Sequence, residues 1–149
     1  MDSINALYDQ VAAGEASPPR EYNAFKRMLS RARHAARKGS TEDQLAGIEV
    51  IQAIGGHWAM SELREFLHIY ETAVRRRALL AAVAEGEGGL LIIRDLSEDV
   101  DVELALEALR YLRRIVDRGT TGRARRLLRA ADPRIRQAAV ELLGHIGGP

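Results

Sequence analysis

The chain has 149 residues, of which 46% are hydrophobic and 29% charged, and it contains no cysteine. This composition is typical of one globular domain and excludes a disulfide framework, thiolate metal sites and a cysteine nucleophile. No apolar run approaches the roughly 20 residues that cross a bilayer, and the N-terminal residues lack the basic region of a secretory signal. We therefore expect a cytoplasmic protein.

The net charge is +1, but the charges fall into three bands. Residues 20–38 hold seven Lys or Arg and one acid, and residues 39–109 hold five Arg and 14 acids. Residues 110–149 hold ten Arg and three acids. Bands of this kind steer partners or self-association.

Apolar residues recur every three or four positions, which predicts helices and no paired strands. In the first half of the chain we expect helices at about 3–13, about 20–37, one ending at Gly55-Gly56, and others at about 57–68 and about 71–85. In the second half we expect the segment LLIIRDL to be a buried helix, followed by a long helix at about 100–117 closed by Gly119. One more helix starts at Thr120 or Thr121, and a final helix follows Asp132. Their expected buried faces include Tyr22, Phe25, Leu29, Ala32 and Ala36; Leu45, Ile48, Ile51 and Ile54; Trp58, Leu63, Phe66 and Leu67; Val74, Ala78, Ala81 and Ala82; Leu104, Ala108, Leu112 and Ile115; Ala124, Leu127, Leu128 and Ala131; and Ile135, Ala139, Leu142, Leu143 and Ile146.

Capping signals mark several helix starts. Ser40 or Thr41 can begin the helix after Gly39, and Thr41 with Gln44 has the spacing of a capping box. Asp132 is placed as an N-cap with proline at the first helical position, where proline is favoured.

The glycines that close alternate helices indicate a repeat. Gly55, Gly86, Gly119 and Gly147 are separated by 31, 33 and 28 residues, and each interval holds two helices. Twelve residues before the closing glycines stand Ile135 and Val74, and eight before them stand Ala139, Ala78 and Gly47. The third copy fits with Leu104, Ala108 and Leu112 in phase when its helix has extra residues. Stacked arrays need such a period, because one hairpin cannot bury its own apolar face.

The segment DPRIRQAAVELLGHIGG resembles the second helix of a HEAT repeat, of the bacterial type also found in phycobilin lyases. Such repeats have an Asp-rich turn, an aliphatic residue followed by Arg, a small pair, an aliphatic pair and Gly-x-Ile-Gly. The matching residues are Asp132, Ile135-Arg136, Ala138-Ala139, Leu142-Leu143, Gly144, Ile146 and Gly147. The segments ETAVRRRALLAAVAEGE and TEDQLAGIEVIQAIGG match less completely.

The resemblance covers residues 20–148 and implies an α-solenoid of about four helical hairpins, with second helices lining a concave face. We therefore expect residues 1–149 to form a single HEAT-like domain, in which residues 1–19 supply an N-terminal capping helix and a linker.

No catalytic or metal-binding constellation is evident. Glu65 and His68 have the i, i+3 spacing of di-iron bundles, but no second Glu-x-x-His occurs, which favours an ordinary surface pair. The segment GEGGLL follows a helix and lacks the lysine of a phosphate-binding loop. No Gly-x-Ser-x-Gly occurs either. We expect no enzyme activity, no cofactor and no metal.

The arginines between residues 110 and 136 are the strongest functional signal. They form either a solvated face paired with acids of adjacent helices or a docking surface. In the repeat register, Arg110 and Arg114 take the places of Glu141 and His145, and Arg76 takes that of Gln137. The candidate partner-binding residues are Arg76, Arg110, Arg114, Arg134, Gln137, Glu141 and His145.

These features predict a non-enzymatic scaffold or adaptor that binds a protein with an acidic surface, with homo-oligomerisation also plausible. The alternative is a nucleic-acid-binding protein that uses the basic bands 20–38 and 110–136, as some HEAT-like DNA repair enzymes do. A mixed-sign lining and the lack of interleaved aromatics weigh against that alternative. Family analogy alone adds a lyase-like or chaperone role.

Overall fold

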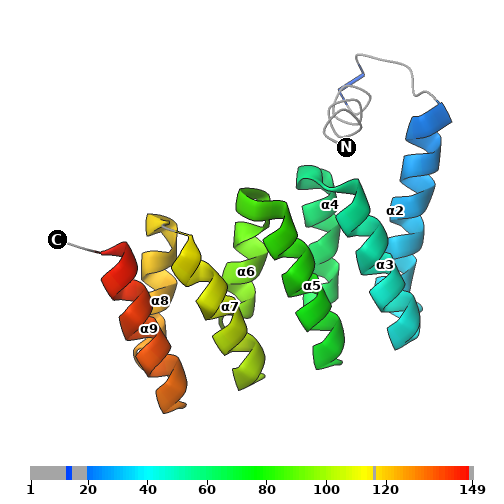
Figure 1. Cartoon of the computed structure of the whole chain (residues 1–149). Coiled ribbons are helices and arrows are strands. Elements are labelled where there is room, and N and C mark those ends of the chain that lie inside the picture. Colours follow the sequence, from blue (N-terminus) through cyan, green and yellow to red (C-terminus); the bar gives the residue numbers. More distant parts are fainter. Residues whose placement is uncertain (1–12, 15–19, 116, 148–149) are drawn as a thin grey trace. The chain divides into compact units, whose positions relative to one another are not determined.

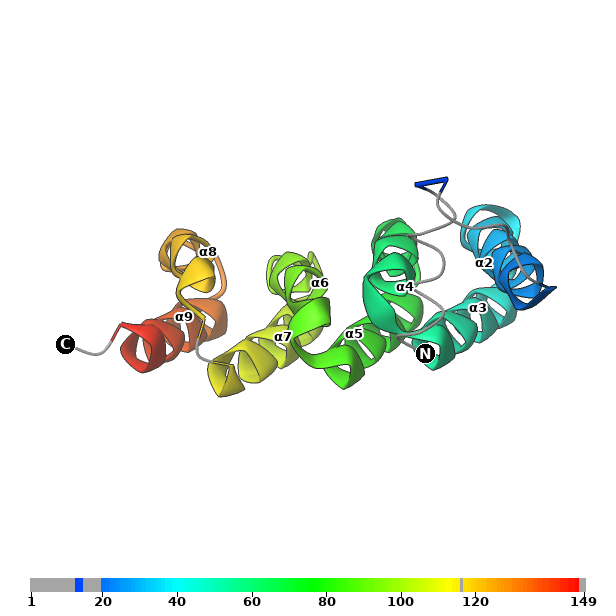
Figure 2. The same cartoon turned by 90° about the horizontal axis from the view of Figure 1, so that it is seen from above.

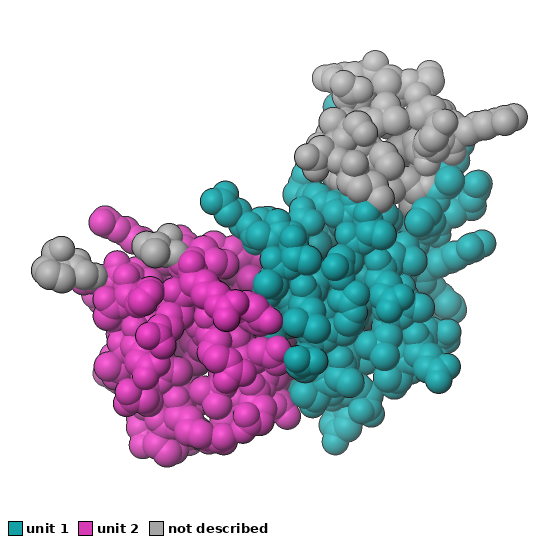
Figure 3. Space-filling view, viewed as in Figure 1, with its two compact units in different colours: residues 1–88 teal, residues 89–149 magenta. Residues whose placement is uncertain are grey.

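The computed structural model describes residues 13–14, 20–115 and 117–147. Over these ranges the chain is helical and forms no strand, which confirms the all-α prediction (Figure 1). The helix expected at about 3–13 lies outside the described residues but for its last position. Contacts divide the chain into two compact units, Met1–Gly88 (unit 1) and Gly89–Pro149 (unit 2), which Figure 3 distinguishes by colour. The single domain expected from the sequence stays a prediction.

Unit 1 is built from two successive helical hairpins. Its elements are α2 (Arg20–Lys38), α3 (Thr41–Ile54), α4 (Gly56–Leu63), the 3-10 turn η1 (Arg64–His68) and α5 (Thr72–Glu85). Helix α3 packs on both α2 and α5, while α4 and η1 pack beside them. Seen from above, α3 and α5 form one layer of this unit, and α2 and α4 form the other (Figure 2).

Unit 2 repeats the same arrangement within itself. After the 3-10 turn η2 (Gly86–Gly89) come α6 (Leu90–Leu96), α7 (Val102–Arg114), the 3-10 turn η3 (Arg118–Thr120), α8 (Thr121–Leu127) and α9 (Pro133–Ile146). Helix α7 packs on α6 and α9, and α8 packs on α9. Here α7 and α9 form one layer, and α6 and α8 the other (Figure 2).

The apolar periodicity of the sequence becomes the core of each unit. In unit 1 the fully buried large side chains are Ile48, Ile51, Ile54, Leu63, Phe66 and Leu79, and in unit 2 they are Ile92, Ile93, Leu96, Leu104, Leu112 and Leu142. Leu29, Ala32 and Ala36 of α2 are buried as expected, while the Tyr22 and Phe25 side chains lie outside the described part. The segment LLIIRDL is a helix, as predicted, because Ile92, Ile93 and Leu96 bury one face.

Leu128 corrects the expected apolar face of α8. This side chain is 39% exposed, because α8 ends at Leu127 and the following turn leads Leu128 out of the packed face. Ala131 is exposed as well, and only Ala124 of that expected set is fully buried.

Side-chain hydrogen bonds cap the starts of α3 and α9, and the cap of α3 lies one residue before the predicted capping box. Ser40, and not Thr41, is the N-cap of α3: its hydroxyl accepts from the Asp43 N–H at 3.2 Å, and the Asp43 carboxylate accepts from the Ser40 N–H at 3.3 Å. The predicted Thr41–Gln44 capping box is therefore displaced by one residue. Asp132 caps α9 with Pro133 at its start, as predicted.

Two other helix ends differ from expectation. The helix predicted at about 57–68 is α-helical only to Leu63 and tightens into the 3-10 turn η1, a common way for a helix to end. Helix α7 stops at Arg114, well before Gly119, because the backbone turns extended at Ile115. Gly119 instead lies in η3, where its N–H donates to the Asp117 carboxylate at 3.1 Å.

One hydrogen-bond pattern occurs near the start of both α5 and α9. Arg75 of α5 donates to the carbonyls of the residues six and five positions earlier, at 2.8 and 2.6 Å. Arg136 of α9 does the same, at 2.8 and 2.9 Å. Each arginine stands directly after the aligned aliphatic residue, Val74 or Ile135, so both segments use it to hold the turn that precedes the helix.

Candidate functional site

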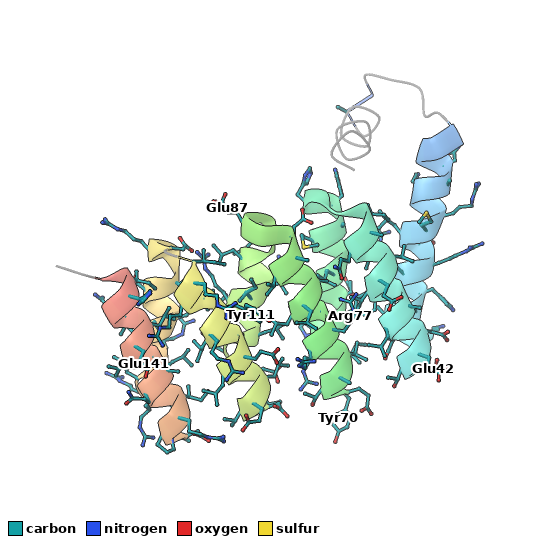
Figure 4. All side chains as sticks on the ribbon, in the orientation of Figure 1. Glu42, Tyr70, Arg77, Glu87, Tyr111 and Glu141 are labelled. Atoms are coloured by element: carbon teal, nitrogen blue, oxygen red, sulfur yellow. The ribbon has the colours of Figure 1, made fainter. Side chains whose placement is uncertain are left out.

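The sequence-predicted site residues are all exposed, and they fall in both units. Arg76 lies on α5 in unit 1. The other six lie in unit 2, on α7 (Arg110 and Arg114) and on α9 (Arg134, Gln137, Glu141 and His145). Figure 4 labels Tyr111 and Glu141 on these two helices. Because α7 packs on α9, the six residues of unit 2 belong to one pair of neighbouring helices.

Arg110 and Arg114 form an uncompensated cationic pair on α7. They are one helical turn apart, so their Cβ atoms are about 5–6 Å from each other. Neither makes an ion pair with any residue that the structure describes. The Arg114 guanidinium lies 5.7 Å from the centre of the Tyr111 ring, a cation–π distance. Like charges at this spacing are mildly destabilising, so a carboxylate bound between them would be favourable.

Glu141 belongs to a local network instead. Its carboxylate accepts a hydrogen bond from Arg113 of α7 at 3.2 Å and another from the Gln137 amide at 3.2 Å. The Arg113–Glu141 pair therefore links α7 to α9. Gln137 and Glu141, two of the predicted partner-binding residues, are therefore hydrogen-bonded to each other in this structure.

Arg134 is also engaged. It pairs with Glu103 of α7 at 2.6 Å and with Asp132 at 3.2 Å. The side-chain hydrogen bond from Arg134 lowers the pKa of Asp132, and the backbone N–H of Arg134 adds to this effect. The same contact with Asp132, followed by that with Glu103, raises the pKa of Arg134. Arg134 thus fastens the start of α9 to α7, a structural task that the sequence did not reveal.

Two further arginines of the C-terminal band bridge α8 to the preceding hairpin. Arg123 pairs with Asp95 at 2.7 Å, and Arg126 pairs with Glu98 at 2.7 Å, in each case 28 residues apart. Asp117 pairs with Arg94. Within the described ranges, Arg118, Arg125 and Arg129 make no ion pair. The arginine-rich segment therefore contains arginines that are paired with acids of neighbouring elements and arginines that make no ion pair with a described residue.

Helix α2 carries a cationic stripe that the sequence showed only as a basic band. Arg27, Arg31, His34 and Lys38 recur at steps of four, three and four, so they share one face. All four are exposed. Arg33 of the same helix points elsewhere and donates from Nε to Glu62 at 2.7 Å.

A groove runs beside this stripe, between α2 and α3. Its volume is about 560 Å³. The apolar lining comes from Met28, Ala32, Ala35, Ala46, Gly47 and Val50, and the polar lining from Arg31, His34, Lys38 and Asp43. Small residues at facing positions of two helices are the sequence signal that would have indicated it.

The remaining candidates give no site. Glu65 and His68 lie exposed in η1, and no group of three or more metal-ligating side chains occurs among the residues with described positions. In that same part of the chain, no helix is both long enough and apolar enough to span a membrane.

The fold and these surfaces define an all-helical protein built from consecutive hairpins with cationic exposed faces. Comparison of the sequence with models of known protein families and with curated proteins finds no match.

Proposed function

We propose that this chain is a non-catalytic protein-binding module, built as a HEAT-like solenoid, whose partner presents an acidic surface. The observation that carries the proposal is the Arg110–Arg114 pair on α7. Both side chains are exposed and uncompensated within the described structure, while Arg113 between them is paired with Glu141. The arginines that join neighbouring elements of unit 2 are paired with acids, whereas Arg110 and Arg114 are not, so this pair is available to a ligand.

Arginine suits a carboxylate partner, because the planar guanidinium donates two parallel hydrogen bonds to one carboxylate. The Tyr111 ring lies 5.7 Å from the Arg114 guanidinium, and this cation–π contact helps to hold the guanidinium in place. The repeat architecture of two-helix units supports the scaffold interpretation, since such units expose long helix faces without requiring a catalytic cleft.

A paired charge reversal tests this function. The variant Arg110→Glu/Arg114→Glu is compared with Arg27→Glu/Arg31→Glu, which reverses two exposed arginines at the same spacing on α2 and changes the net charge equally. Tagged proteins are used for affinity capture from the source cells, followed by quantitative mass spectrometry. We expect one acidic protein to be retained in stoichiometric amount by the unmodified chain and by the α2 variant, and lost from the α7 variant. Equal retention by both variants would show that α7 is not the binding surface.

Nucleic-acid binding is the second candidate function, and the stripe on α2 favours it. Four exposed cationic or titratable side chains follow one helix face over about 16 Å, at a rise of about 1.5 Å per residue. The test is fluorescence anisotropy with labelled duplex and single-stranded DNA and RNA at rising salt concentration. Binding that weakens steeply with salt and is lost in Arg27→Glu/Arg31→Glu would support this function. An unchanged anisotropy at low salt would exclude it.

A further inference from the structure

The exposed face of the last hairpin carries an apolar residue at a position that is buried in every other copy. Leu109 of α7 stands one turn before Arg113, whose ion pair marks the side of α7 that packs on α9. Leu109 is 2% exposed. In the repeat register, 31 residues further on, Val140 holds the same position in α9 and is 55% exposed.

The earlier copies agree with Leu109. The equivalent residue stands seven positions before the closing glycine, and it is Ile48 in α3 and Leu79 in α5. Both are fully buried. Single exposed aliphatic residues are ordinary on protein surfaces. An exposed valine at a position that is otherwise buried in the repeat is stronger evidence of a binding surface, because the equivalent face of the other helices is covered by packing.

The positions one turn before and one turn after Val140 are exposed on α9 as well. One turn before Val140 stands Arg136, whose equivalents Gln44, Arg75 and Ala105 are all buried, whereas Arg136 is exposed. One turn after Val140 stands Gly144, and a Cβ added there meets no atom within 4 Å. The three residues form a stripe along α9, on the side away from α7. The absence of a side chain at Gly144 allows another helix to approach closely.

The charge of this face selects its occupant. The acids of the last hairpin that the structure describes are already paired: Asp117 with Arg94, Asp132 with Arg134, and Glu141 with Arg113. Arg136 donates only to neutral carbonyls, so its positive charge is not compensated.

Arg125 adds a second uncompensated charge. It stands two positions from Arg123, about 200° around α8, and Arg123 faces α6 through its pair with Asp95. Arg125 therefore points away from α6, toward the same open side of the hairpin, and makes no ion pair with a described residue. A second copy of this face would bring like charges together.

We propose that the face formed by Arg136, Val140 and Gly144 on α9, with Arg125 of α8 beside it, is a docking surface for a helix of another protein. The docked helix has an apolar stripe flanked by Asp or Glu, and it packs on α9 as α9 packs on α7. This surface is separate from Arg110 and Arg114, so it does not depend on the proposed function.

The test uses a defined probe and matched variants of the whole chain. The probe is a fluorescein-labelled helical peptide of about 20 residues, with leucines at i, i+3, i+4 and i+7 and glutamates on both flanks. The control peptide has the same sequence with lysines in place of the glutamates. Anisotropy titrations compare the unmodified chain with Val140→Glu and with Val100→Glu, which places the same charge at a valine that is 92% exposed in the loop before α7.

We expect the glutamate peptide to bind the unmodified chain and Val100→Glu alike, and to bind Val140→Glu at least about tenfold more weakly, as for a central contact residue. Val140→Glu should still retain the acidic protein that the unmodified chain captures through Arg110 and Arg114, which separates this surface from the proposed function. Circular dichroism confirms that each variant is folded. Failure of the unmodified chain to bind, equal weakening by Val100→Glu, or equal binding of the lysine peptide would overturn the proposal. So would self-association in sedimentation that Val140→Glu abolishes, because the occupant would then be a second copy.

Discussion

Replacing Leu109 and Val140 separately by alanine removes apolar carbon from equivalent positions of α7 and α9, with very different expected costs. Leu109 is 2% exposed, and its three lost carbon atoms, at about 0.8 kcal/mol each, remove about 2.4 kcal/mol of burial. The cavity left between α7 and α9 adds to this, so the total lies within about 2.7–5 kcal/mol. Val140 is 55% exposed and loses only two carbon atoms, half of whose contact is with water. Its cost should stay below about 1 kcal/mol.

The assay is urea unfolding followed by far-ultraviolet circular dichroism, which reports the helices of the whole chain. The free energy of unfolding is compared at equal m-value, because a changed m-value would indicate an altered unfolded state or an added intermediate. Trp58 is the only tryptophan of the chain and lies in unit 1, so its fluorescence gives a probe remote in sequence from both substitutions.

A result in which Leu109→Ala costs no more than Val140→Ala would refute the reasoning. It would mean that Leu109 does not pack against α9, or that the register that aligns the two residues is wrong. The docking surface inferred on α9 would then lose its main support, whatever the peptide titrations show.

Four further substitutions have effects that follow from the same structure. Arg75→Ala leaves two turn carbonyls without their donor and should reduce the free energy of unfolding by about 1–3 kcal/mol, measured in urea; an unchanged midpoint would contradict the hydrogen bonds. Asp132→Asn keeps a capping side chain but removes the charge beside Arg134. Because the pKa of Asp132 is lowered in the folded state, its charge stabilises the fold above the usual pKa, and this stabilisation is lost as the pH falls through the folded pKa. The unmodified chain should therefore exceed the variant in stability at pH 7 and lose this advantage as the pH falls through the folded pKa of Asp132, and a difference that grows toward acid pH would contradict this. Gly144→Ala should stabilise helix α9 by about 1 kcal/mol, since the added Cβ meets open space. Gly55→Ala should destabilise by about 1–3 kcal/mol because φ is +67° there, and thermal melting of the two variants should shift in opposite directions.

Short-range rules predicted most of the helices and the core. Ile48, Ile51 and Ile54 are buried because a period of three to four residues places them on one helix face. Asp132 caps α9 because a carboxylate before proline has few other roles at a helix start. Such signals act within one or two turns, and the sequence displays them directly.

The misplaced features depend on competition between neighbouring residues. Ser40 and Thr41 both carry a capping hydroxyl, and Ser40 becomes the cap because Asp43 can return the hydrogen bond. Gly119 resembled a helix stop, but the Asp117 carboxylate holds its N–H in a separate turn. Spacing alone does not decide between such alternatives.

The arginines could not be sorted from the sequence, because their partners lie 28 or 31 residues away along the chain. Arg126 reaches Glu98 across 28 residues, whereas Arg125 beside it reaches no described acid. One position along the helix, about 100°, decides whether the side chain faces the preceding hairpin. That choice depends on where α8 lies relative to Asp95 and Glu98, which no local pattern encodes.

The ten arginines of the C-terminal band therefore perform three different tasks. Arg136 holds the carbonyls of a turn, as Arg75 does in unit 1. Others, such as Arg134, join α9 or α8 to the preceding hairpin. The remainder, with Arg110 and Arg114 among them, present charge to solvent without a described counter-charge, a property that the exposed Arg136 shares. Substitution of the first two groups should lower stability, and substitution of the third should leave stability nearly unchanged and remove binding. If a variant loses both its stability and its partner, the result does not identify the binding surface. If a variant keeps its full stability and loses its partner, the substituted residues belong to the binding surface.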